Sequence, residues 1–226
     1  MNINNSSSMK YYFLILILAL ASCKTNTVIA DKNTSIKDSL SFELSQIYGS
    51  DQGIRLSSGF KDKMKMIQSI DTFNFNRIVA FTRQNGFPNE NLLGKSNYKR
   101  ESVKMAAFSV LLHNPHRLVN EQEYFDLFLG EVKKGLLKKE NFADILDKYY
   151  WTKSKNKENR RVFYGSQFGK PCIQTKETTN LARIEIGLKP LADSEFVDCA
   201  GEELDMPKKK ELKQLRLNNQ HRRNIL

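Results

Sequence analysis

The stretch ESVKMAAFSVLLHNP, residues 101–115, carries the strongest periodic pattern in the chain and decides the fold class. Its apolar residues recur at i, i+3, i+4, i+7 and i+8, which makes one continuous stripe on an α-helix. The stripe consists of Val103, Ala106, Ala107, Val110 and Leu111. Because alanine is small, a second helix can approach this stripe closely, so we expect the helix to be central. It should end at His113, since the residue before Pro115 avoids helical geometry.

Upstream of this stretch, apolar residues at helical spacing predict further helices. They cover residues 39–48, residues 61–70, and a run from Asp71 or Thr72 to Gly86. Gly49 is expected to stop the first of these helices, so that residues 51–55 form a polar connection. Gly86 with Pro88 just beyond it is a usual helix end. Residues 89–97 should form a loop around Gly94.

Downstream, the same spacing predicts helices over residues 121–134 and 141–151, with a hydrophilic loop after them. Residues 162–167 should be extended and end in a turn. Residues 172–200 hold little periodicity, although Leu181, Ile184 and Leu188 could line one more short helix. Helices with short connections indicate a mainly α fold, a single compact multi-helix domain with an irregular C-terminal segment.

The N-terminal residues 1–22 are typical of a bacterial lipoprotein signal peptide. Lys10 is followed by an uncharged, largely apolar run that is too short for a membrane-spanning helix of about 20 residues. The run ends Leu20-Ala21-Ser22-Cys23, which resembles a lipobox, in which the cysteine is lipidated and becomes the mature N-terminus. The alternative is an ordinary cleaved signal followed by a fortuitous cysteine. We expect stable membrane anchoring through Cys23.

These features divide the chain into a signal peptide, a tether from lipidated Cys23, a helical domain and a basic tail. The four parts are residues 1–22, 23–36, 37–200 and 201–226. Lys24 follows the cysteine, whereas an aspartate there retains lipoproteins in the inner membrane of enteric bacteria. The expected location is therefore the cell envelope, at the outer membrane and facing the periplasm.

The net charge of +11 is concentrated in residues 207–226, where seven Lys and Arg residues face Glu211 alone, a net +6. Nucleic acid is not the expected partner outside the cytoplasm. The tail could contact anionic lipid headgroups or another anionic envelope component, or it could be a solvated terminus. The periplasm is oxidising, so Cys172 and Cys199 could form a disulfide. It would close a loop of about 28 residues and stabilise the fold by roughly 3 kcal/mol. The alternative is two buried thiols.

Several short motifs occur in an order that resembles a bacterial domain family of unknown function. They are Asp51-Gln52 with Arg55, Gly86-Phe87-Pro88, Gly94, the helix ending in His113, Asp147, Tyr164-Gly165-Ser166-Gln167, Asn180 with Arg183, and Gly187-Leu188-Lys189-Pro190-Leu191. The match runs from about residue 40 to residue 195. The chain departs from the family at two places. Around the histidine the family usually has glutamine and an acidic residue, where this chain has Leu112-His113-Asn114. After the later aspartate the family tends to have arginine, where this chain has Lys148. The resemblance implies a fold type and candidate residues, but no reaction.

His113 is the first candidate for chemistry, because histidine exchanges a proton near neutral pH. A general base also needs an orienting carboxylate, which Asp51 or Asp147 could supply. Arg55 has a planar fork of donors that could clamp a carboxylate or phosphate. Further hydrogen bonds could come from Gln52, Tyr164 and Gln167.

The same residues have a structural interpretation. His113 would cap its helix, Asp51 and Arg55 would form an internal ion pair, and the others would satisfy buried backbone groups. The sequence predicts no cofactor and no metal site, since Pro115 spoils the helical spacing of His113 and His116.

We favour a non-catalytic, lipid-anchored envelope protein that binds an anionic ligand or an envelope partner. The alternative is a hydrolase or transferase with His113 as general base, Asp51 or Asp147 as its orienter and Arg55 as anion clamp. The two hypotheses differ in whether these residues converge in an open cleft.

Overall fold

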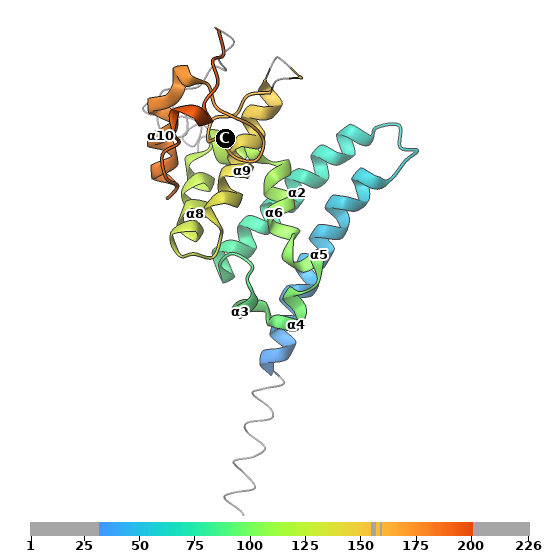
Figure 1. Cartoon of the computed structure of the whole chain (residues 1–226). Coiled ribbons are helices and arrows are strands. Elements are labelled where there is room, and N and C mark those ends of the chain that lie inside the picture. The colour runs from blue at the N-terminus through green and yellow to red at the C-terminus, as the bar shows by residue number, and fades with distance from the viewer. Residues whose placement is uncertain (1–31, 155–156, 159, 201–226) are drawn as a thin grey trace, which may run out of the picture.

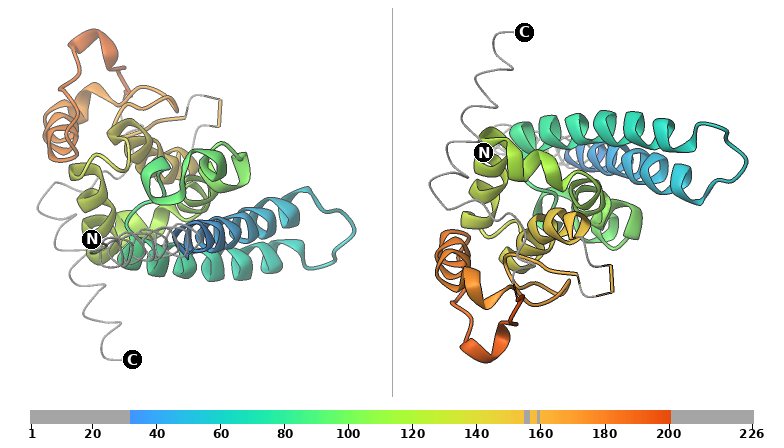
Figure 2. Two further views of the ribbon diagram at one scale, coloured as in Figure 1. Left: turned by 90° about the horizontal axis from the view of Figure 1, so that it is seen from below. Right: turned by 90° about the horizontal axis from the view of Figure 1, so that it is seen from above.

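The computed structural model describes residues 32–154, 157–158 and 160–200. Residues 32–56 are helical, and α2 (Lys63–Asn85) runs back beside them. The two helices form a long hairpin, residues 32–85, that projects from the rest of the domain and that we call the hairpin arm (Figures 1 and 2). The predicted signal peptide, the lipidation site Cys23 and the basic tail lie outside the described residues.

Short helices follow the hairpin arm and lead into the body of the domain. The remaining elements are α3 (Glu90–Leu93), α4 (Lys95–Tyr98), α5 (Glu101–Lys104), α6 (Ala106–His113), α7 (Pro115–Asn120), α8 (Gln122–Lys133), α9 (Lys139–Lys153), the 3-10 helix η1 (Ile173–Thr175), α10 (Lys176–Glu185) and the 3-10 helix η2 (Asp193–Glu195). The domain is mainly α-helical, as the sequence predicts.

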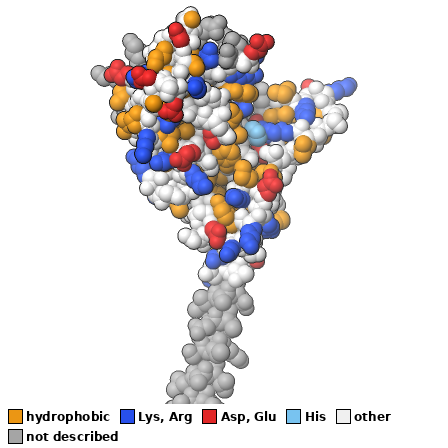
Figure 3. Space-filling view, viewed as in Figure 1, with side chains coloured by type: hydrophobic (Ala, Val, Ile, Leu, Met, Phe, Trp, Pro, Cys, Tyr) orange, Lys and Arg blue, Asp and Glu red, His pale blue; other side chains and the backbone are white. Residues whose placement is uncertain are grey.

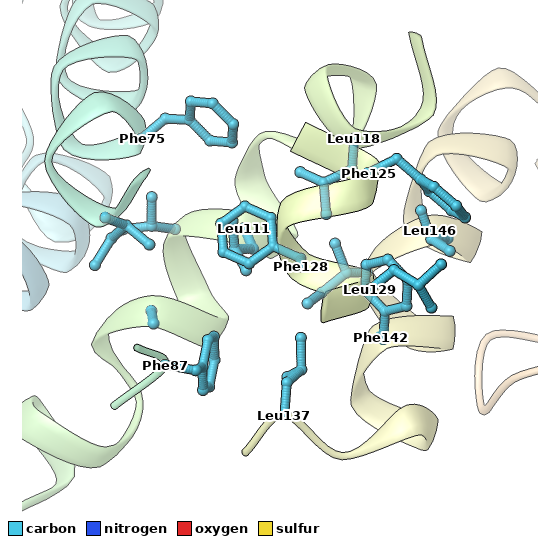
Figure 4. Close-up of a cluster of buried hydrophobic side chains, with 14 of the residues drawn as sticks. Phe75, Phe87, Leu111, Leu118, Phe125, Phe128, Leu129, Leu137, Phe142 and Leu146 are labelled. Carbon is cyan, nitrogen blue, oxygen red and sulfur yellow. The ribbon is translucent and has the colours of Figure 1, made fainter. Parts of the chain in front are cut away.

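The core forms around α6, which packs on α2 and on α9, while α7 packs on α8 and α9. Every residue of the predicted stripe from Val103 to Leu111 is buried. Figure 4 shows Leu111 among aromatic side chains from neighbouring helices, including Phe128 and Phe142. The centroids of the Phe125 and Phe142 rings are 5.6 Å apart. The predicted central position of this stretch is confirmed, but the stripe does not lie on one helix. The helix is interrupted at Met105, so Val103 lies in α5 and the other four residues lie in α6.

The first helix is longer than predicted, and the expected break at Gly49 is wrong. The helix continues to residue 56, so residues 51–55 are helical and not a polar connection, and residues 32–36 are helical and not part of a tether. Ile47, Asp51 and Ile54 are all buried and recur on one face. Packing of this face outweighs the cost of a glycine inside a helix, about 1 kcal/mol.

Helix α2 is also continuous where two helices were predicted, with Asp71 inside it. The predicted loop at residues 89–97 contains α3 and α4. Two predicted helix ends are confirmed. Gly86 adopts φ 81° and its N–H donates to Thr82 O, while α6 ends at His113 and Pro115 starts α7.

The C-terminal segment is irregular. In residues 160–200 the extended pieces form isolated bridges, Val162 with Pro171 and Cys172 with Val197. Cys172 and Cys199 are joined by a disulfide with their Cα atoms 5.5 Å apart. The predicted short helix is α10, but Leu181 and Ile184 are exposed on it, and its buried residues are Thr179, Ala182 and Arg183. In the described part of the chain, no helix is both long and apolar enough to cross a bilayer.

Candidate functional site

Four of the predicted site residues lie together: Asp51 and the three side chains that contact it, from Gln52, Arg55 and His113. The Asp51 side chain is completely buried on the inner face of the first helix. His113 Nδ1, at the end of α6, lies 3.0 Å from Asp51 Oδ1. Gln52 Nε2 donates to Asp51 Oδ2 at 2.7 Å, and Arg55 Nη1 donates to Asp51 Oδ1 at 3.1 Å. The fold brings the end of α6 against the first helix, so that two residues 62 positions apart are in contact. The structure therefore places the first motif and the helix-terminal histidine in one polar cluster, which we call the Asp51 cluster.

Arg55 is the cation of this cluster and is held from two sides. Its Nη1 also donates to the backbone oxygen of Asp51 at 2.7 Å, and its Nη2 donates to Asp71 Oδ1 at 2.6 Å. Asp71 is a member that sequence reasoning missed, because the sequence presented it only as a helix cap. With two carboxylates on its guanidinium, Arg55 fits the predicted internal ion pair better than the predicted anion clamp.

The Asp51 cluster also has the residue types of a metal site. One ligand atom each from Asp51, Asp71 and His113 lie within 4.8 Å of one another. However, the Arg55 guanidinium already donates to both carboxylates and supplies the positive charge that a metal ion would bring. The geometry therefore favours an ion-pair network over metal coordination.

Asp147 lies in a different cluster, so Asp51 is the carboxylate that contacts His113. The Asp147 side chain is completely buried in α9 and accepts three backbone N–H bonds from the following turn. Oδ1 accepts from Phe163 at 2.8 Å and Tyr164 at 2.6 Å, and Oδ2 accepts from Ser166 at 2.9 Å. Burial raises the pKa of Asp147 to about 6, although these hydrogen bonds act in the opposite direction.

Tyr164 and Gln167 belong to this second cluster. The backbone oxygen of Tyr164 accepts a hydrogen bond from Arg183, which also donates to Lys189 O at 2.7 Å. Gln167 Nε2 donates to Asp144 Oδ2 at 2.9 Å, and burial raises the pKa of Asp144. The predicted set thus divides into the Asp51 cluster and a turn organised around Asp147, where the polar groups satisfy backbone N–H and C=O groups.

The turn depends on a glycine. Gly165 adopts φ 66°, in the left-handed region that residues other than glycine rarely adopt. A Cβ at this position would lie 2.6 Å from Leu191 Cδ1. The motif Tyr164-Gly165-Ser166-Gln167 is therefore explained by backbone geometry around Asp147.

Comparison of the chain with protein-family models, with curated proteins and with solved structures found no match. The resemblance to a bacterial domain family accordingly stays a prediction from the motifs, and function has to be argued from the geometry of the chain itself.

Proposed function

We propose that this chain is a lipid-anchored cell-envelope protein whose helical domain binds a partner and does not catalyse a reaction. The anchor is supported by the sequence, in which the apolar run before Cys23 has the length and ending of a lipoprotein signal. The proposed location is the outer membrane, facing the periplasm. Labelled palmitate should enter the wild-type chain and not Cys23→Ser, and labelling of both or of neither would refute lipidation at this residue.

The observation that carries the interaction role is the exposure of large apolar side chains at the end of the hairpin arm. We call residues 56–66 the hairpin tip. Leu56 is 85% exposed, Met64 68% and Phe60 47%. Figure 3 shows hydrophobic side chains on the projecting arm. Apolar side chains gathered on one exposed end indicate an interaction surface.

The length of the arm fits this role. The first helix covers residues 32–56, which corresponds to roughly 37 Å at 1.5 Å per residue. The described chain starts at the other end of that helix, away from the hairpin tip (Figure 1). An anchor attached before residue 32 would therefore leave the hairpin tip available to an envelope protein at a distance from the anchor.

The interaction is testable by placing a photo-crosslinking amino acid at Phe60 in the producing cells. The matched control position is Lys138, which is exposed on the body of the domain. We expect discrete cross-linked species from position 60 and none from position 138, and Leu56→Glu should abolish them without changing the melting temperature. Equal cross-linking at the two positions would refute a role for the hairpin tip.

One observation favours the second candidate function, a hydrolase or transferase. His113 Nδ1 contacts the buried Asp51, and no hydrogen-bond partner of its Nε2 lies among residues 32–154, 157–158 and 160–200. Nε2 could then accept a proton from a nucleophile while Asp51 fixes the orientation of the ring. The test is turnover of ester, peptide and glycan substrates by the wild type and by His113→Ala. Turnover that disappears in the variant would establish this candidate, whereas absent or undiminished turnover would remove it.

A further inference from the structure

A cationic pocket lies beyond the C-terminal end of α9 and includes no member of the Asp51 cluster and neither Asp147 nor Gln167. Its volume is about 400 Å³. Its lining includes Trp151, Lys157, Glu158, Arg160, Phe168 and Lys170. The sequence predicts a hydrophilic loop over residues 152–161. The structure instead folds part of this loop against an aromatic side chain of α9.

Trp151 contacts one cation of the pocket lining, Arg160, and one cation next to the pocket, Lys148. The Arg160 Cζ atom lies 3.6 Å from the centroid of the Trp151 ring, and Lys148 Nζ lies 3.9 Å from the same centroid. Phe168 stands next to Trp151, with ring centroids 5.9 Å apart. Cation–π contacts of this kind hold two like charges close together at one indole. Burial, and then the charge of Arg160, lower the pKa of Lys148.

Four cations in or next to the pocket lack carboxylate partners in the part of the chain that the structure describes, although Glu158 also belongs to the lining. Among the described residues, no ion pair involves Lys148, Arg160, Lys157 or Lys170. Lys157 Nζ donates to Ser154 O and Lys170 Nζ donates to Ser194 O, both at 3.1 Å, which fixes the side chains without neutralising them. Arg55 and Arg117, by contrast, each pair with a carboxylate. Three of these cations line the pocket together with Glu158, and Lys148 lies next to the pocket on the Trp151 ring, so a bound anion would relieve the remaining repulsion.

We propose that this pocket binds a ligand that carries a phosphate group. A phosphate offers several anionic oxygens at once, which suits the planar fork of Arg160 together with the point charges of the lysines. The volume lies within the range of small-molecule sites and leaves room for a group attached to the phosphate. Trp151 and Phe168 would provide apolar contact for that group.

The phosphate could belong to a soluble ester or to a lipid headgroup, because the chemistry that recognises both is the same. The pocket does not depend on the hairpin tip, so either surface can fail while the other is retained. Two arms of one experiment separate the two sources of phosphate.

The experiment uses the full chain with Cys23→Ser, so that membrane binding does not arise from the lipid anchor. The first arm is calorimetric titration with glycerol 3-phosphate, with glycerol as the uncharged comparison. The second arm is cosedimentation with phosphatidylcholine vesicles that contain phosphatidic acid, compared with phosphatidylcholine alone. The variants are Arg160→Gln and Lys170→Met, which change two lining cations, and the matched control is Arg100→Gln, an exposed arginine on another part of the domain.

We expect binding in at least one arm, weakened at least tenfold by Arg160→Gln and by Lys170→Met and unchanged by Arg100→Gln. Added salt should weaken the same binding. Binding of the soluble ester would assign the site to a small phosphorylated ligand, and binding of vesicles alone would assign it to a lipid headgroup. Absence of binding in both arms, or equal affinities of the wild type and a correctly folded Arg160→Gln, would overturn the proposal.

Discussion

Asp147→Ala removes one carboxylate that serves three backbone N–H groups, so its cost can be worked out from the structure. The N–H groups of Phe163 and Tyr164 are buried and share Oδ1, while that of Ser166 is partly buried and uses Oδ2. Each buried donor left without an acceptor costs about 1–3 kcal/mol. Asp147→Asn keeps an oxygen for the two bonds at Oδ1, but it removes the charge and puts an amide donor in place of the acceptor of the Ser166 N–H. The alanine variant should therefore be less stable than the asparagine variant by about 2–6 kcal/mol.

The pH dependence provides a second measurement on the same residue. Burial raises the pKa of Asp147 from 3.8 to about 6 in the folded protein, which corresponds to about 3 kcal/mol. Because the folded-state pKa is the higher one, this group's contribution to stability is complete below pH 3.8 and is lost as the pH rises through 6. From pH 5 to pH 7 the wild type should therefore lose stability relative to Asp147→Asn.

The assay is urea unfolding of the full chain at pH 5, 6 and 7, followed by circular dichroism. The control is Asp126→Asn, because Asp126 is an exposed carboxylate and its replacement should change little. Equal stabilities of the alanine and asparagine variants would show that Asp147 does not hold the turn. A pH-independent difference between the wild type and Asp147→Asn would refute the raised pKa.

Three further perturbations follow from the structure. Arg55→Ala should lower the free energy of unfolding by about 2–4 kcal/mol, because it leaves the buried carboxylate of Asp51 without its cation. Arg77→Ala breaks a more exposed ion pair, so in the same thermal unfolding experiment it should lower this free energy by less than about 1 kcal/mol. Gly165→Ala should lower the free energy of unfolding by about 1–3 kcal/mol in chemical denaturation, because Gly165 has a positive φ and its Cβ would be too close to Leu191. Gly49 lies inside a helix with no atom near the position of a Cβ, so Gly49→Ala should raise this free energy by about 0.5–1 kcal/mol. Reduction of the Cys172–Cys199 disulfide should lower the melting temperature by the equivalent of about 3 kcal/mol.

Each of these expectations has a contradicting outcome. Similar losses for the two arginine variants would mean that the Asp51 cluster contributes no more than a surface pair. A Gly165→Ala variant as stable as the wild type would show that the turn relaxes. The double variant Cys172→Ser/Cys199→Ser is the control for reduction, and a response of this variant to reductant would assign the effect elsewhere.

Local sequence determined the features that depend on neighbouring residues along the chain. The helical stripe from Val103 to Leu111 could be predicted because its spacing repeats within a few turns. Gly86 and Pro115 mark helix ends for reasons of backbone geometry alone. The irregular character of the C-terminal segment followed from its lack of periodicity. The pairing of His113 with Asp51 was one of two options, and the sequence did not distinguish Asp51 from Asp147.

Tertiary structure decided whatever depends on contacts between distant segments. Gly49 does not stop its helix, because Ile47 and Ile54 are buried by packing that the local sequence does not describe. The partner of Arg55 on α2 lies 16 residues away, and Asp147 meets N–H groups up to 19 residues away. Likewise, Arg160 belongs to a predicted hydrophilic loop and Lys148 to a predicted helix, and only packing placed both beside the Trp151 ring. Helical periodicity is a property of the backbone, whereas the position of a charge relative to other charges is set by how the helices pack.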